Sequence, residues 1–380
     1  MRYLVLLFFA VPVFLICPCV SAQTAAGRDF TGRAAGISSS LNDNALAAQV
    51  LLTGIDGRLS LVPAMRSLLE RIPAGGIMLF SYNLDSPKAD VKKLLSETAG
   101  LVARNGGIPP FMAVDHEGGL VHRFGPGVEK LPPALFFWEL ARKEGRAAAL
   151  AEAETMYLRS ALEIRSLGIT MVLGPVAEVS NEETRVFLDT RSYGPDPDFT
   201  QAAASAFIKS MERAGIASVV KHFPGNTAED PHSGTSTLTA ARPILDEMVK
   251  PFAFIIRRVR PAAVMVSHVK VPALDGQRNA SLSRRIIRDW LRGELGFEGI
   301  VLADDFSMSA ITASGLSPAD AAVEALDAGV DMIMVWPKDL SSVHAAILSA
   351  LKTGRLPRER LREAAAHIIA EKLRYEVIAP

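Results

Sequence analysis

Eight short apolar segments, each ending in polar residues, Gly or Pro, constrain the fold of this chain more than any other feature. They are QVLLTGID near residue 50, GIMLFS near 77, PFMAVD near 111, ITMVLGP near 170, IASVVKH near 217, AAVMVSH near 263, GIVLADD near 300 and GVDMIMV near 330. Their hydrophobicity is continuous rather than alternating, which is typical of strands buried on both faces, as in a parallel sheet covered by helices. Segments with a helical pattern separate them, for example at residues 87–101, 147–167, 318–326 and 342–351.

The number and spacing of these segments predict the fold class. Eight strand and helix units over roughly 280 residues match the size of a (β/α)8 barrel. We therefore predict a single-domain α/β protein, a TIM-type (β/α)8 barrel over residues 45–376. Ser86 is the expected N-cap of the helix over residues 87–101. A doubly wound open sheet is the structural alternative.

Ionisable residues stand at the carboxyl ends of four of the predicted strands. They are Asp115, Lys221, His222, His268, Asp304 and Asp305. Because parallel strands of a barrel end at one rim, these six groups are predicted to converge on one cleft. Acids and imidazoles gathered there indicate an active site rather than a device for stability.

Residues 219–232, with the sequence VVKHFPGNTAEDPH, carry the strongest catalytic pattern. A strand ends in Lys221 and His222, the chain turns, and Asp230 and His232 follow two residues apart in a polar loop. A carboxylate beside an imidazole can orient the ring and stabilise its charged form, which suits it to proton transfer near neutral pH. The Asp230 and His232 pair is therefore a candidate for general acid/base catalysis.

Residues 1–22 have the pattern of a secretory signal peptide: a basic residue, an apolar run over residues 4–16 and small residues before Gln23. Cleavage before Gln23 predicts an exported protein, periplasmic or extracellular, that begins with an exposed leader over residues 23–44 rich in Ser, Gly, Asn and Ala. The apolar run is shorter than the roughly 20 residues that span a bilayer, and no later segment is long and apolar enough. No stable membrane span is therefore expected after cleavage.

Cys17 and Cys19, the two cysteines of the sequence, both lie in the predicted signal peptide. The processed chain would then have no disulfide and no thiolate metal ligand. Lipid attachment at one of these cysteines, giving a lipoprotein, is the alternative to simple cleavage. No metal is expected, since no spacing such as His-x-x-x-His on a helix occurs.

The charge pattern argues against a nucleic-acid partner. Acidic and basic residues number 41 each, no basic block occurs, and aromatic residues make up 7% of the chain. We expect a small or neutral substrate and a monomeric protein.

Five motifs give the sequence a family resemblance. They are VDHEGGLVHRFGPGVEKLPP from Val114, DTRSYG from Asp189, VVKHFPG from Val219, NASLS from Asn279 and LGFEGIVLADDFSM from Leu295. The chain resembles glycoside hydrolase family 3, in particular its single-domain β-N-acetylglucosaminidases. The motifs occur in the family's order and cover nearly all of the sequence after the predicted signal peptide.

The resemblance implies roles for individual residues. Asp304 matches the catalytic nucleophile, His232 the general acid/base, and Asp230 the carboxylate that pairs with it. The residues that match groups holding sugar hydroxyls are Asp115, Arg123, Arg191, Lys221 and His222. His268 is expected in the wall of the pocket. A carboxylate nucleophile and a proton donor are the two groups that a retaining glycosidase requires, and no cofactor is implied.

Four positions depart from the pattern of the resembled family. The usual KHFPGHG is KHFPGNT here, with Asn226 and Thr227, and the loop over residues 221–230 is about two residues shorter than in typical relatives. Ala303 stands where Ser or Thr usually precedes the nucleophile, and His116 stands where Gln usually follows the rim aspartate. None of these changes removes a group that the mechanism requires.

The predicted activity follows from the same resemblance. Related β-glucosidases take a carboxylate acid/base from a second α/β domain, for which this sequence has no room after its final helix, whereas the Asp-x-His loop resembles the N-acetylglucosaminidase branch. We expect a retaining exo-β-N-acetylhexosaminidase that releases terminal β-linked N-acetylglucosamine from small carbohydrates, either peptidoglycan fragments or chitooligosaccharides. The alternatives are a phosphorylase of the same branch and an exported N-acetylglucosamine-binding protein with little catalysis.

Overall fold

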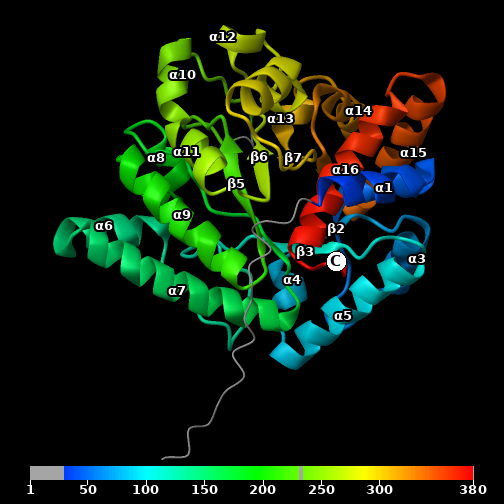
Figure 1. Cartoon of the computed structure of the whole chain (residues 1–380), viewed down its shortest axis with the longest axis horizontal. Coiled ribbons are helices and arrows are strands. Elements are labelled where there is room, and N and C mark those ends of the chain that lie inside the picture. Colours follow the sequence, from blue (N-terminus) through cyan, green and yellow to red (C-terminus); the bar gives the residue numbers. More distant parts are fainter. Residues whose placement is uncertain (1–29, 231–233, 380) are drawn as a thin grey trace, which may run out of the picture.

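The computed structural model describes residues 30–230 and 234–379, and its centre is a closed barrel of eight parallel strands in sequence order (Figure 1). The strands are β1 (Leu51–Gly54), β2 (Gly76–Leu79), β3 (Phe111–Val114), β4 (Met171–Val172), β5 (Ala217–Phe223), β6 (Ala263–Val266), β7 (Ile300–Ala303) and β8 (Met332–Val335). Each lies in one of the eight apolar segments, which confirms the predicted (β/α)8 barrel. The open sheet is wrong, because β1 pairs with β8 through Leu51 and Ile333 and closes the ring.

Helices surround the barrel on all sides of Figure 1. The α-helices are α1 (Thr31–Ser40), α2 (Asp43–Gln49), α3 (Pro63–Arg71), α4 (Ser81–Leu84), α5 (Lys88–Arg104), α6 (Ala134–Glu144), α7 (Arg146–Leu167), α8 (Arg185–Leu188), α9 (Pro197–Arg213), α10 (Arg242–Met248), α11 (Lys250–Arg258), α12 (Pro272–Asp275), α13 (Ser309–Thr312), α14 (Pro318–Ala328), α15 (Pro337–Thr353) and α16 (Arg358–Arg374). Two 3-10 helices, η1 (Asp189–Arg191) and η2 (Ala280–Leu282), and a π-helix, η3 (Arg285–Glu294), complete the layer among the described residues.

The four predicted helical segments are confirmed as parts of α5, α7, α14 and α15. The predicted N-cap of α5 is wrong. Pro87 occupies that position and makes no side-chain cap, while the Ser86 hydroxyl accepts a hydrogen bond from Arg58 Nε at 3.1 Å. By contrast, α14 begins with a true cap, since Ser317 Oγ accepts from the backbone N–H of Asp320 and a proline follows at the first helical position.

The core is continuous from the strands to the helices. Tyr157 of α7 and Phe207 of α9 are both buried, with their ring centroids 4.9 Å apart, and the Tyr157 hydroxyl bonds to that of Tyr193 at 3.0 Å. Each large apolar side chain of this kind contributes about 1.5–3 kcal/mol by leaving water. Phe223 of β5 packs against Phe252 of α11 and Trp290 of η3, with ring centroids 5.6 and 5.0 Å apart, so hydrophobic packing also holds the helical layer to the barrel.

The exposed leader predicted over residues 23–44 is wrong for its second half. Residues 31–40 form α1, which packs against α16 with Ala34 and Ser38 buried. These two small side chains are four residues apart on one helical face, so they allow close approach between the helices. A segment rich in Ser, Gly, Asn and Ala is typical of an exposed leader, but tight helix packing favours the same small residues. The signal peptide and residues 23–29 lie outside the described residues.

The amino-terminal end of the barrel is closed by α16. Asp331, just before β8, is fully buried and accepts hydrogen bonds from Arg360 and Arg292 and binds His367 Nδ1 at 3.0 Å. Burial alone would raise the pKa of Asp331, but the charges of Arg292, His367 and Arg360 outweigh it and hold the pKa well below its ordinary range. This ionic cluster stabilises the amino-terminal end of the barrel. The predicted site residues lie at the opposite, carboxyl-end rim.

No helix within residues 30–230 and 234–379 combines the length and hydrophobicity needed to cross a membrane.

Candidate active site

The carboxyl-end rim brings the predicted ionisable residues together. Asp115 follows β3, Lys221 and His222 lie in the last part of β5, and Asp304 follows β7. The register between β5 and β6 shifts between Val220 and Phe223, the interval that holds Lys221 and His222. Irregular pairing of this kind turns side chains out of the regular alternation of a strand, and it is common beside active sites.

A chain of alternating charges crosses the rim. Lys221 Nζ lies 2.7 Å from Asp115 Oδ1 and 2.6 Å from Glu117 Oε1. Arg191 binds the same Glu117 through two parallel contacts, Nε to Oε2 at 2.8 Å and Nη2 to Oε1 at 2.9 Å. Arg123 Nη2 is 3.8 Å from the other oxygen of Asp115. The structure thus places two predicted sugar-binding residues, Lys221 and Arg191, against one carboxylate, Glu117, to which the sequence analysis assigned no role.

These groups hold one another in their charged forms. Burial would raise the pKa of Glu117, yet Lys221 and Arg191 lower it far below its ordinary value of 4.5. Burial would lower the pKa of Lys221, but Asp115 and Glu117 raise it above 10.5. The donors and acceptors at this side of the rim are therefore fixed before any ligand arrives.

His222 has a partner that the sequence analysis missed. Its Nδ1 lies 2.6 Å from Oε1 of Glu178, a buried residue in the loop after β4. A carboxylate in this position orients the imidazole and decides which ring nitrogen carries the hydrogen. Glu178 is six residues beyond the end of β4, and no local pattern distinguishes it from an ordinary loop acid.

Asp304 lies just after β7 and is held in its charged form. Its backbone N–H donates to Val266 O at 3.1 Å, and its Oδ1 accepts from the backbone N–H of Asp305 at 2.9 Å. Burial would raise the pKa of Asp304, but the charges of His222 and His268 and the bond from Asp305 lower it below its ordinary value. The carboxylate is therefore ionised at neutral pH.

The side chain of the neighbouring acid, Asp305, is hydrogen-bonded to other side chains of the protein. Its side chain accepts from Trp336 Nε1 at 2.6 Å and from the Ser307 hydroxyl at 2.7 Å, while its carbonyl oxygen lies 3.0 Å from His268 Nε2. His268 is 1% exposed, and its Nδ1 lies 2.7 Å from Ser281 Oγ. The Asp305 carboxylate is therefore occupied by Trp336 and Ser307, and the His268 ring is held beside its backbone.

The structure describes part of the loop that is predicted to carry the general acid/base, up to Asp230 and again from residue 234. Thr227 Oγ1 and Ser236 Oγ are 2.7 Å apart and join its two limbs near the barrel. Asp230 is exposed at the end of the described stretch. His232 lies outside the described residues, so its role stays a prediction.

The residues that depart from the pattern of the resembled family are buried. His116 is fully buried, its Nε2 lies 2.8 Å from Ser160 Oγ, and burial lowers its pKa to about 3. Asn226 is also buried and donates its backbone N–H and its side-chain amide to Glu178. Ala303 is the last residue of β7 and is buried in the barrel.

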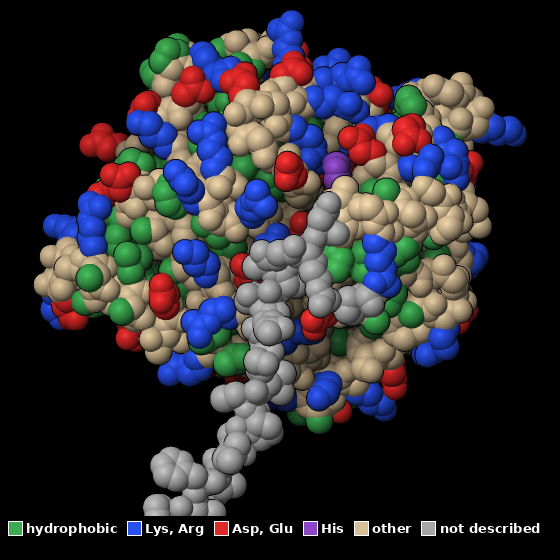
Figure 2. Space-filling view, viewed as in Figure 1, with side chains coloured by type: hydrophobic (Ala, Val, Ile, Leu, Met, Phe, Trp, Pro, Cys, Tyr) green, Lys and Arg blue, Asp and Glu red, His purple; other side chains and the backbone are tan. Residues whose placement is uncertain are grey.

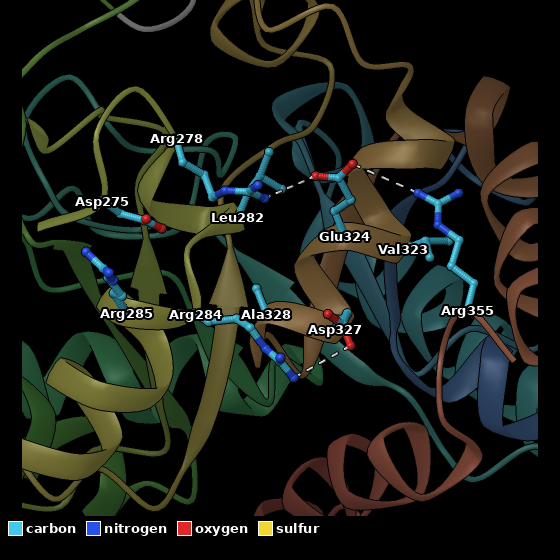
Figure 3. A pocket seen from close by; sticks show the side chains of 10 residues that line it. All are labelled: Asp275, Arg278, Leu282, Arg284, Arg285, Val323, Glu324, Asp327, Ala328 and Arg355. Atoms are coloured by element: carbon cyan, nitrogen blue, oxygen red, sulfur yellow. Dashed lines mark hydrogen bonds and ion pairs between the residues drawn. The ribbon is translucent and has the colours of Figure 1, made fainter.

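Two pockets of the described structure lie away from the predicted site residues. The first, of ≈ 460 Å³, is in the helical layer between η3 and α14, where Figure 3 shows charged side chains paired across it. Its pairs include Arg278 with Glu324 at 3.5 Å and Arg284 with Asp327 at 3.8 Å, and it contains none of the predicted site residues. The second, of ≈ 510 Å³, is largely apolar and reaches Thr190, next to Arg191. Acidic and basic side chains are interspersed on the face that Figure 2 shows.

A closed parallel barrel with an ionised carboxylate, fixed cations and imidazoles on its carboxyl-end rim defines a (β/α)8-barrel enzyme. Among the described residues, no group of three or more His, Cys, Asp or Glu side chains is arranged to hold a metal ion. The model of the glycosyl hydrolase family 3 N terminal domain matches residues 51–370, and the chain belongs to this family.

Relatives and solved structures agree with this assignment. The chain is 36% identical over 293 residues to a beta-hexosaminidase of Methylococcus capsulatus, covering 76% of this chain and 82% of that protein. It is 32% identical over 316 residues to a beta-hexosaminidase of Stenotrophomonas maltophilia, covering 81% and 90%. A glycoside hydrolase family 3 beta-N-acetylglucosaminidase from Paenibacillus matches with a TM-score of 0.80 and 32% identity, over 90% of this chain and 64% of that longer one.

Proposed function

We propose that this glycoside hydrolase is a retaining exo-β-N-acetylhexosaminidase, which releases terminal β-linked N-acetylglucosamine from peptidoglycan fragments or chitooligosaccharides. The observation that carries the proposal is the ionised Asp304 at the rim, beside His222 and the charged network of Lys221. The names of the beta-hexosaminidase relatives support the choice of sugar.

In the first step, an oxygen of Asp304 attacks the anomeric carbon and the bond to the leaving oxygen breaks. His232 donates its proton to that oxygen, so the leaving group departs as an alcohol. In the second step, water attacks the same carbon, His232 takes a proton from the water, and Asp304 is released. Asp230 orients the His232 ring and stabilises its charged form between the two steps.

The rest of the rim holds the sugar. Asp115 can accept hydrogen bonds from sugar hydroxyls, while Lys221, Arg191 and Arg123 can donate them. Because these side chains are already held by Glu117 and by one another, binding does not have to order them. The fixed network therefore favours one orientation of the sugar over Asp304.

The test is hydrolysis of a chromogenic aryl N-acetyl-β-glucosaminide. The wild type is expected to release the aryl group, and Asp304→Asn is expected to remove turnover because an amide is a poor nucleophile. Asp305→Asn is the matched control: it changes the adjacent acid, keeps an oxygen to accept from Trp336, and should retain far more activity. An inactive wild type, or a fully active Asp304→Asn, would reject the proposal. Sugar phosphate formed when inorganic phosphate is present would identify a phosphorylase instead.

His232→Ala should separate the two steps. With an activated aryl leaving group, which needs no proton, Asp304 should still react, but release of the sugar should become slow. The covalent glycosyl-enzyme would then accumulate, and added azide should speed its breakdown. Asp230→Ala should show a milder loss, of about 10²-fold, in line with general acid/base contributions. Intact mass after rapid quench measures the intermediate; equal, wild-type rates on natural and activated substrates would assign the acid/base to another residue.

A further inference from the structure

We propose that Glu178 is a positioning residue for the reaction, which fixes the His222 imidazole with its hydrogen on Nδ1, and that Asn226 holds Glu178 in place for this task. The inference rests on the proposed function and adds a residue to it. Glu178 itself does not reach the substrate, since it is 4% exposed and acts through the ring of His222.

The contacts of Glu178 all come from donors. Its Oε1 lies 2.6 Å from His222 Nδ1 and accepts from the backbone N–H of His222 at 3.3 Å. Asn226 donates its backbone N–H to Oε2 at 2.7 Å and its side-chain amide to Oε1 at 3.0 Å. Two backbone N–H groups and an amide can be satisfied together by an ionised carboxylate, which is purely an acceptor.

This arrangement decides the tautomer of His222. A neutral imidazole has one donor and one acceptor nitrogen, and the carboxylate at 2.6 Å requires the donor at Nδ1. The other nitrogen, Nε2, is then left as the ring's acceptor on the edge that points away from Glu178. His222 is also among the groups that influence the pKa of Asp304, so the ring that Glu178 orients is part of the nucleophile's surroundings.

The backbone around Glu178 is equally constrained. The Ser192 hydroxyl donates to Glu178 O at 2.8 Å, and the backbone N–H of Ala177 donates to Lys221 O at 2.8 Å. The loop after β4 is therefore bound to the end of β5 at Ala177 and to the residue that follows η1 at Glu178. A side chain anchored in this way can hold a ring within the small tolerance that catalysis requires.

The experiment compares Glu178→Gln with the exchanged pair Glu178→Gln/Asn226→Asp. In the single variant, the new amide group must face either the backbone N–H of Asn226 or the ring of His222, so it leaves a donor unpaired or forces the other tautomer. The exchanged pair keeps the total charge and supplies an acceptor for the new amide, but moves the carboxylate away from His222 Nδ1. We expect kcat of the single variant to fall about 10²-fold, the size of effect that misplacement by about 1 Å produces, with a smaller change in KM.

The exchanged pair should recover the melting temperature without recovering kcat. In spectra of protein labelled with ¹⁵N-histidine, His222 of the wild type should show a protonated Nδ1, and Glu178→Ala, which removes the acceptor, should lose that signature. Wild-type kcat in Glu178→Gln, full recovery of kcat in the exchanged pair, or a wild-type ring protonated at Nε2 alone would each overturn the inference. The spectra do not depend on turnover, so they test Glu178 even if the proposed hexosaminidase activity is not found.

Discussion

Glu117 shows how much a single buried carboxylate can hold together. It is 4% exposed at the side chain and neutralises two cations, Lys221 and Arg191. Glu117→Gln should lower the free energy of unfolding by about 3–5 kcal/mol, because it leaves Arg191 without its bidentate carboxylate and Lys221 with Asp115 as its remaining counter-charge. Denaturant unfolding measures the loss. Glu129→Gln is the matched control, since Glu129 pairs with Arg159 on the surface and its loss should be below about 1 kcal/mol; equal losses would contradict the prediction.

The stability of the wild type and that of Glu117→Gln should depend differently on pH. The pKa of folded Glu117 lies below its ordinary value of 4.5, so its contribution to stability is fully present above pH 4.5 and is lost as the pH falls through the folded pKa. The gap in melting temperature between wild type and Glu117→Gln should therefore be constant from pH 7 to about pH 5 and shrink below pH 4.5.

Lys372 is the opposite case, a buried amine with no acidic partner among the described residues. Its Nζ has no hydrogen-bond partner among the described residues and lies 5.6 Å from the centre of the Phe111 ring, and burial lowers its pKa well below 10.5. Unfolding lets the amine take up a proton, so Lys372→Met should stabilise the protein at pH 7 by about 1–3 kcal/mol. The gain should vanish as the pH approaches 10.5. Thermal unfolding at several pH values checks this, and a lower melting temperature at pH 7 would contradict it.

At the scale of elements, α1 acts as a support for α16. Ala34 is fully buried between these helices, whereas Ala35 is exposed on the same helix. Ala34→Asp should lower the melting temperature by placing a charge in the interface, while Ala35→Asp should change it little. Because α16 closes the end of the barrel opposite the rim, kcat/KM at 25 °C should be unchanged in both. Equal melting temperatures for the two variants would show that α1 adds no stability.

The sequence predicts the strands well because each is buried on both faces and must therefore be an unbroken apolar run. It predicts the meeting of Asp115, Lys221 and Asp304 for a related reason, since the ends of parallel strands share one rim. It does not predict the partners, because Glu178 contacts His222 across 44 residues of chain. Such pairs are decided by how β4 and β5 lie together, and no pattern in either segment encodes them.

Whole-molecule predictions concern the part of the chain before the barrel. We propose that the protein is exported and cleaved before Gln23, from the basic, apolar and small residues that precede it. Intact mass of protein recovered from outside the cytoplasm should correspond to a chain that begins at Gln23. A larger mass that includes fatty acyl groups, with Cys17 or Cys19 at the N-terminus, would instead establish the lipoprotein.

The pairing of β8 with β1 also affects how readily the folded protein can aggregate or be degraded. A ring of strands has no edge, so it presents no row of unpaired backbone groups on which a second molecule could add a strand. After residue 19 the sequence has no cysteine, hence no disulfide to slow unfolding. We therefore expect aggregation and proteolysis to require opening of the ring, so that the lifetime of the protein is governed by the rate of unfolding rather than by an equilibrium.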